Sequence, residues 1–283
     1  MSAAVPRPAA TVVLVREAST GLEVFLLRRH AKSGFMANAY VFPGGRLDEA
    51  DTEPALIERL EGIDPQKLCH EMRGSGSPER AAGHLIACIR ETFEESGVLL
   101  ATRVGGGQAI EQERAQEWRD RLNAGEVSFL DVVQSLDLVL NGSSVAYFAH
   151  WITPTAESRR YDTRFFLAVS PEGQSGVHDG HETTDSLWIA PGEALDAHAK
   201  GGLMLAPPQW FLLGKLAALS DAQSAVRWAR QRAVPTVQPT IGTVDGALVI
   251  ALPGDPIHEG GADPDGALRR IVMSDGRWTM PAS

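Results

Sequence analysis

The sequence predicts an α/β fold, because segments with strand character alternate with segments that have a helical period. Three short runs rich in β-branched and aliphatic residues come first, at residues 11–16, 23–29 and 39–42. A helix is expected over residues 78–96, and strand patterns return at residues 145–151 and 164–169. A chain of 283 residues with 43% hydrophobic residues can bury a sizeable core, as one large domain or slightly more.

The helix at residues 78–96 has recognisable ends. Ser77 is a candidate N-cap, Pro78 suits the first helical position, and Gly97 suits a left-handed stop. Apolar residues recur every three or four positions, which predicts a buried stripe made of Ala82, Ile86, Ile89 and Phe93.

Three carboxylates, those of Glu91, Glu94 and Glu95, share one face near the end of this helix. Like charges at these spacings repel one another, so either water solvates the three groups or a divalent cation binds between them. Arg90 is placed to pair with Glu94 one turn further on. The cluster by itself is compatible with both interpretations.

A glycine-rich turn upstream favours the cation. Phe42-Pro43-Gly44-Gly45 is typical of a strand that enters a tight turn, where glycines let backbone N–H groups approach an anion. With residues 90–98, this turn resembles the Nudix hydrolase signature: Gly, five residues, Glu, seven residues, then Arg-Glu-apolar-x-Glu-Glu-x-Gly-apolar. The signature is split here, because Asp51 stands where the family has its first Glu and residues 52–89 replace seven residues.

Further segments are similar to the coenzyme A diphosphatase subgroup of Nudix proteins, in which the signature also carries an insertion. They are Leu26 to Arg29, Trp151 to Pro154 and Arg159 to Phe166. Two later segments resemble the Nudix family in general: Leu187 to Ile189 its late strand, and Pro207 to Gln209 with the apolar helix after it the closing helix. This resemblance extends over roughly residues 10 to 220. It implies a Nudix-type α/β/α sandwich with a mixed central sheet and helical insertions.

We therefore expect a Nudix domain over residues 8–230, with an insertion at 52–76 that lies over the substrate side. A helical segment at 109–140 should contain two helices, the second with a helical period through Leu140.

Residues 236–283 predict a small β-rich appendage, in which Asp245-Gly246 is a hairpin signal. The acidic loop at 254–266 is interpreted as solvated turns, because its ligand spacing is not diagnostic of a metal site.

The resemblance implies hydrolysis of a diphosphate that links a nucleoside to another group, with Mg²⁺ or Mn²⁺ as cofactor. Glu94 and Glu95 would be metal ligands, and Glu91 would be a further ligand or would orient the attacking water. Arg90 would hold these glutamates in place through ion pairs.

The same resemblance places the turn and a later loop in the site. Gly44 and Gly45 would let the chain pass close to the metal, with a backbone carbonyl such as that of Gly45 as a ligand. A remaining carboxylate is expected from a later loop, where Glu182 is the first candidate and Asp185 the second. His181 is an alternative base.

The best substrate prediction is coenzyme A or acyl-coenzyme A, cleaved to 3′,5′-ADP and (acyl-)phosphopantetheine. Basic side chains should bind its phosphates, or else are simple surface charges; they are Arg28, Arg29, Lys32, Arg159, Arg160 and Arg164. Phe35 and Met36 would line an acyl or pantetheine channel or pack in a core. One alternative is a diphosphatase for ADP-ribose, dinucleotides or nucleoside triphosphates, and another is a Nudix domain that only binds a ligand.

The composition limits partners and location. A net charge of −10 argues against broad binding to nucleic acid or to an anionic membrane. The partner that the resemblance implies is a small nucleotide. Two cysteines and a C-terminus without a peroxisomal signal favour a cytoplasmic enzyme. A homodimer is compatible with the resemblance, with residues 109–140 as its interface or as a lid.

Overall fold

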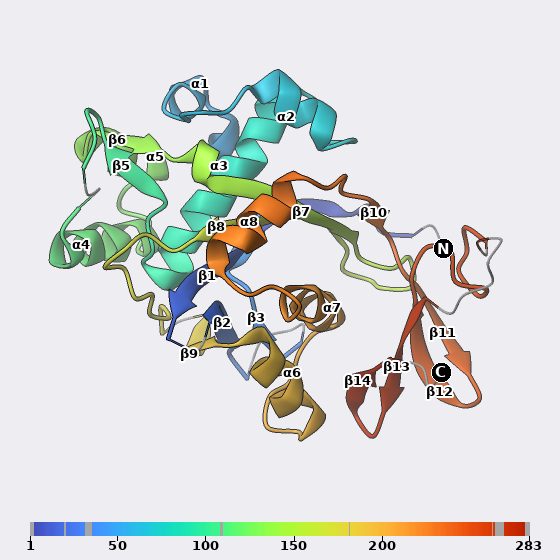
Figure 1. Ribbon diagram of the computed structural model, residues 1–283. Coiled ribbons are helices and arrows are strands. Elements are labelled where there is room, and N and C mark those ends of the chain that lie inside the picture. The colour runs from blue at the N-terminus through green and yellow to red at the C-terminus, as the bar shows by residue number, and fades with distance from the viewer. Residues whose placement is uncertain are drawn as a thin grey trace.

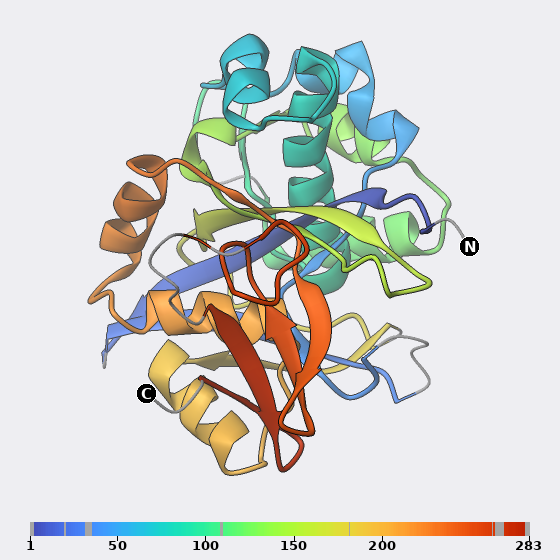
Figure 2. The same ribbon diagram turned by 90° about the vertical axis from the view of Figure 1, so that its right-hand side faces the viewer.

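The computed structural model describes residues 3–19, 21–31, 36–107, 110–180, 182–261, 263 and 269–280. A mixed β-sheet lies between two helical layers, which confirms the α/β/α sandwich (Figures 1 and 2). A second, four-stranded sheet lies beside the sandwich at the C-terminal end of the chain (Figure 1).

The central sheet has eight strands, with β10-β7-β8-β1-β2-β3 in order, β4 paired to β1 and β9 paired to β2. Its strands are β1 (Arg7–Ala18), β2 (Gly21–Arg29), β3 (Tyr40–Val41), β4 (Gly44–Arg46), β7 (Val145–Ile152), β8 (Tyr161–Val169), β9 (Thr183–Ile189) and β10 (Thr236–Val237). Strand β1 runs parallel to β8 and antiparallel to β2. Residues 12–15 of β1 are fully buried, because helices cover both faces of the sheet.

One helical layer is built on α3 (Pro78–Ser96), whose predicted ends are confirmed. The Ser77 hydroxyl accepts a hydrogen bond from the Arg80 amide at 3.3 Å, and Gly97 ends the helix at φ 72°. The predicted apolar stripe of α3 is fully buried against the sheet. The three glutamates lie in the last two turns of α3, beside the C-terminal end of this stripe.

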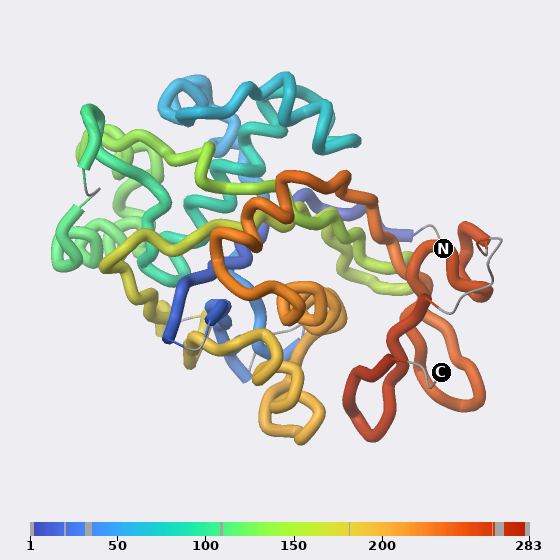
Figure 3. The backbone as a smooth tube through the Cα atoms, viewed as in Figure 1, coloured from blue at the N-terminus to red at the C-terminus, as the bar shows by residue number. Residues whose placement is uncertain are grey.

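The insertion adds short helices to the same layer. They are the 3-10 turn η1 (Glu49–Thr52), α1 (Pro54–Ile57) and α2 (Pro65–Glu71). Leu56, Leu68 and Met72 bury their side chains in the core that surrounds α3. Figure 3 shows most of the insertion beside the N-terminal part of α3.

The segment at residues 109–140 forms two helices, α4 (Gln112–Asn123) and α5 (Phe129–Ser135). The expected continuation of the second helix through Leu140 is wrong. Asp137 adopts a left-handed conformation at φ 50°, and Leu138–Leu140 form strand β6, which pairs with β5 (Ala101–Arg103). Alternate leucines satisfy a strand period as well as a helical one, and the pairing with β5 decides between the two.

The other helical layer contains α6 (Pro191–Ala199), α7 (Pro207–Leu216) and α8 (Ala222–Arg230). After it, β10 pairs with β7, so the start of the expected appendage extends the central sheet. The small sheet contains β11 (Thr240–Val244), β12 (Ala247–Ala251), β13 (Arg270–Ser274) and β14 (Arg277–Thr279). Its buried side chains, among them Trp278, pack against Trp210 and Phe211 of α7.

The predicted hairpin at residues 245–246 is confirmed, since Asp245 and Gly246 both have positive φ between β11 and β12. Asp255, by contrast, is not a solvated loop residue. Its buried carboxylate accepts two hydrogen bonds from Arg270, at 2.7 and 2.8 Å, which ties the acidic loop to β13. Within the described ranges, no helix combines the length and the apolar character needed to cross a membrane.

Candidate active site

A buried ion pair joins the two halves of the split signature. Arg90 Nε and Nη2 donate to the Asp51 carboxylate at 2.8 and 2.9 Å, and Nη2 also donates to the Arg46 carbonyl at 3.0 Å. Asp51 is 1% exposed and Arg90 is 8% exposed. The chain therefore leaves for the insertion at Asp51 and returns to the same point through α3.

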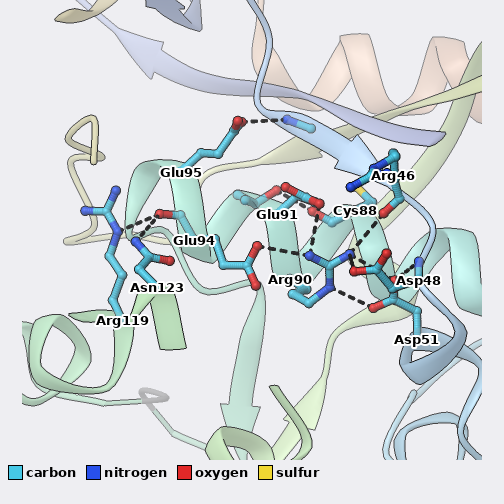
Figure 4. Close-up of polar contacts among 12 residues, drawn as sticks. Arg46, Asp48, Asp51, Cys88, Arg90, Glu91, Glu94, Glu95, Arg119 and Asn123 are labelled. Atoms are coloured by element: carbon cyan, nitrogen blue, oxygen red, sulfur yellow. Dashed lines mark hydrogen bonds and ion pairs between the residues drawn. The ribbon is translucent and has the colours of Figure 1, made fainter. Parts of the chain in front are cut away.

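The remaining nitrogen of Arg90 binds the glutamates. Its Nη1 donates to Glu91 Oε1 at 2.9 Å and to Glu94 Oε2 at 3.0 Å (Figure 4). One guanidinium thus hydrogen-bonds three carboxylates and lies 3.8 Å from a fourth, that of Asp48, and the predicted pair between Arg90 and Glu94 is present. Arg90 therefore holds the carboxylates of Glu91 and Glu94 in place on one face of α3.

Glu95 lies on the other side of this cluster, where the glycine turn approaches α3. The Gly44 amide donates to Glu95 Oε2 at 2.8 Å. A Cβ on Gly45 would lie 2.2 Å from a carboxylate oxygen of Glu91, so only glycine leaves room for that side chain. Both glycines of the turn therefore lie against glutamates of α3, as the resemblance to the signature implies.

The carboxylates hold more negative charge than their surroundings neutralise. Loss of contact with water and the neighbouring charge of Glu94 together raise the pKa of Glu91 to about 7, although Arg90 opposes both effects. Burial also raises the pKa of Glu94, and it raises the pKa of Glu95 well above the usual range. A bound cation would relieve this repulsion.

The donor set fits a hard divalent cation. Carboxylate oxygens are the ligands that Mg²⁺ and Mn²⁺ prefer, and Mg²⁺ usually takes only one or two of them besides waters and substrate oxygens. In the described part of the chain, no group of three or more Asp, Glu, His or Cys side chains is arranged to hold a metal ion by itself.

A cavity of about 620 Å³ opens over these glutamates. Its acidic lining comes from Glu91, Glu94, Glu95, Asp120, Asp179 and Glu182. Glu182 lies in the loop before β9, and its negative charge contributes to the raised pKa of Glu95. Asp185, the second candidate, does not line this cavity and instead accepts a hydrogen bond from the Tyr40 hydroxyl at 2.8 Å.

Two of the predicted phosphate-binding arginines are placed elsewhere. Arg160 is 8% exposed and donates to the carbonyls of Thr153 and Ala4. Arg164 is 1% exposed and donates to the Arg73 carbonyl. Both side chains bond backbone carbonyls in the interior, so the prediction that they bind substrate phosphates is wrong.

Other expectations have different outcomes. Arg28 is exposed at the end of β2, next to Asn38, and Arg29 follows it on the same strand. Lys32, Phe35 and His181 lie outside the described residues. No described residue of the insertion at 52–76 lines the cavity, so its expected position over the substrate side is wrong.

Two residues that the sequence pattern did not single out, Arg119 and Asn123, connect α4 to the site. Arg119 Nε and Asn123 Nδ2 both donate to the Glu94 carbonyl, at 3.0 and 3.1 Å (Figure 4). Arg119 Nη2 donates to the Val177 carbonyl at 3.0 Å, in the loop that leads to Asp179. A signal was present, since Arg119 interrupts the apolar face that Ala115 and Leu122 form on α4.

The raised pKa values predict how the metal-free protein responds to pH. A carboxylate whose pKa is higher in the folded state binds more protons there than in the unfolded state, so stability falls as pH rises through that range. We expect the melting temperature in a chelator to drop as the pH rises from about 4.5, the ordinary pKa of a glutamate, through about 7, and to drop less in Glu91→Gln. Thermal unfolding of both proteins tests this, and an equal drop in the two would contradict it.

Comparison with known proteins agrees with this geometry. A family model described as the NUDT19 Nudix domain matches residues 2–216. The acyl-coenzyme A diphosphatase NUDT19 of Xenopus laevis is 27% identical over 288 residues, covering 89% of this chain and 76% of its own. The proteins of the same name from Gallus gallus and Homo sapiens are 29% and 28% identical, covering 89% and 84% of this chain and 76% and 72% of their own.

Among solved structures, a NUDIX hydrolase from Alicyclobacillus acidocaldarius superimposes with a TM-score of 0.62 at 24% identity. The match covers 79% of this chain and 96% of that one, and shows that the sandwich is a Nudix fold. The chain belongs to the NUDT19 Nudix family, and with it to the Nudix hydrolases.

Proposed function

We propose that the protein hydrolyses the diphosphate of coenzyme A or acyl-coenzyme A and releases 3′,5′-ADP and (acyl-)phosphopantetheine. The observation that carries the proposal is the cluster around Arg90. There Asp51 meets Glu91 and Glu94, although the insertion separates Asp51 from both glutamates in the sequence. The names of the matched relatives supply the substrate class.

The proposed cofactor is Mg²⁺ or Mn²⁺. Glu91, Glu94 and Glu95 are its proposed ligands, together with the backbone carbonyl of Gly45, a residue so close to Glu91 that an added Cβ would meet the Glu91 carboxylate. When bound, the cation neutralises charge on the diphosphate and thereby eases attack at phosphorus.

The protein's own groups have separate proposed roles. Arg90 keeps Glu91 and Glu94 oriented, and the Gly44 amide orients Glu95. Glu182, which also lines the cavity, accepts the proton that the attacking water loses. Arg28 and Arg29 remain candidates for pairing with substrate phosphates. The cytoplasmic location and the homodimer stay predictions.

Hydrolysis of a substrate panel tests the proposal. Purified protein with Mg²⁺ or Mn²⁺ is incubated with coenzyme A, acetyl-coenzyme A, ADP-ribose, NADH and nucleoside triphosphates, and the products are identified by mass spectrometry. We expect 3′,5′-ADP and phosphopantetheine from the coenzyme A substrates. Release of AMP from ADP-ribose or NADH alone would favour the alternative diphosphatase, and the absence of any metal-dependent product would favour a ligand-binding domain.

Arg119 provides a test of how α4 supports the site. Arg119→Met removes the hydrogen bonds to the Glu94 and Val177 carbonyls while keeping an apolar stem of similar length. We expect kcat to fall by about 10- to 100-fold because the last turn of α3 loses its anchor. Steady-state kinetics measure this. Arg114→Met on the exposed side of α4 is the control, and an equal effect of both changes would contradict a positioning role.

A further inference from the structure

A second groove continues from the catalytic cavity along α4. Its volume is about 590 Å³, and it shares the side chains of Gln116 and Arg119 with the first cavity. It lies between the N-terminal half of α4, the loop at residues 171–177 and the start of β5. A molecule that is bound over the glutamates can therefore extend past Arg119 into this groove.

The lining of the groove is mostly uncharged. Amide side chains come from Gln112, Gln116, Asn141 and Gln174, and apolar surface comes from Ile110, Ala115 and Val177. Glycine backbone at positions 97, 173 and 176 also faces the groove and offers peptide groups without side chains. Val177 is 52% exposed, so its apolar surface is accessible to a ligand. Such a surface suits a neutral molecule that contains amide and methyl groups.

The charged groups in the groove disfavour phosphate. Glu111 and Glu172 are acidic, and Arg119 is the cationic residue of the described lining. The guanidinium of Arg119 already donates to the carbonyls of Glu94 and Val177. A phosphate dianion in this groove would face two carboxylates and a guanidinium whose donors are largely engaged.

We propose that this groove binds the pantetheine arm of the substrate, and that the phosphorylated adenosine of the same bound molecule extends from the catalytic cavity in another direction. The assignment rests on the proposed function. Coenzyme A has two chemically distinct ends on either side of its diphosphate: a neutral arm with two amides and a thiol, and a nucleoside with a 3′-phosphate. The amide-lined groove matches the first end, and its two carboxylates repel the second.

A bulky side chain in the groove tests the assignment. Ala115 is partly exposed and lines the groove but not the catalytic cavity, so Ala115→Trp fills the proposed subsite. Gln112→Trp fills it from an exposed position of the first helical turn, in case the first variant does not fold. Glu117→Trp, on the same helix but outside both cavities, is the matched control.

We expect the KM for coenzyme A to rise by about tenfold or more in Ala115→Trp and Gln112→Trp, with a much smaller change in kcat. Inhibition by 4′-phosphopantetheine should weaken in parallel, while inhibition by 3′,5′-ADP should match that of the control. A KM equal to that of Glu117→Trp, or a selective loss of 3′,5′-ADP inhibition, would overturn the assignment. Wild-type protein without activity on coenzyme A would instead refute the proposed function, and the assignment with it.

Discussion

Glu95→Gln is expected to abolish metal-dependent turnover while leaving the fold intact. The substitution keeps the size of the side chain and an oxygen that can accept the Gly44 N–H, so the contact between the glycine turn and α3 survives. It removes a negative charge from a site whose proposed side-chain ligands are all carboxylates. We expect kcat/KM to fall by about 10³-fold, which corresponds to about 4 kcal/mol of transition-state stabilisation.

Two measurements separate this loss of activity from unfolding. Product formation with Mg²⁺ and Mn²⁺ gives kcat/KM, and the melting temperature in a chelator reports the fold. Burial raises the pKa of Glu95, so removing its charge should leave the metal-free protein at least as stable as the wild type. Glu113→Gln, on α4 and outside the cavity, serves as control. A Glu95→Gln protein that keeps most of its activity would exclude Glu95 as a metal ligand.

The parts of the fold that sequence could predict are those specified by neighbouring residues. The ends of α3 follow from Ser77, Pro78 and Gly97, whose backbone preferences act locally. The hairpin at Asp245 and Gly246 is local in the same sense. The meeting of the glycine turn with α3 is not local, and the resemblance to the Nudix signature predicted it across the insertion.

The arginines show where sequence reasoning stops. A basic residue near a strand end looks the same whether it faces a ligand or the interior, and only tertiary structure shows that Arg160 and Arg164 bind backbone carbonyls. Arg119 was missed for the converse reason. Its partner carbonyl at Glu94 is brought close by the packing of α4 on α3, and no spacing along the chain encodes that contact.

The insertion is a related case. Its position inside the signature suggested a cover for the substrate, whereas Leu56 and Met72 bury it along the N-terminal end of α3. Apolar side chains every few residues in a segment of this length are sufficient to build such a layer. What the signature does specify is the point where the insertion begins, because Asp51 must reach Arg90.

Arg90→Met is expected to have the largest effect on stability. Asp51 is 1% exposed, and its carboxylate accepts two hydrogen bonds from Arg90. Without the guanidinium, a buried carboxylate loses its counter-charge, and Glu91 and Glu94 lose theirs at the same time. Removal of one partner of a buried ion pair costs about 3–5 kcal/mol, so we expect a decrease of that size in the free energy of unfolding.

Denaturant unfolding at constant pH measures this decrease, and a double variant tests its cause. Adding Asp51→Asn to Arg90→Met removes the uncompensated buried charge, so the double variant should recover part of the lost stability. Arg59→Met is a suitable control, because its ion pair with Asp137 is largely exposed and should contribute little. A loss below about 1 kcal/mol in Arg90→Met would mean that water replaces the guanidinium. In that case the ion pair would not be what holds the two halves of the signature together across the insertion.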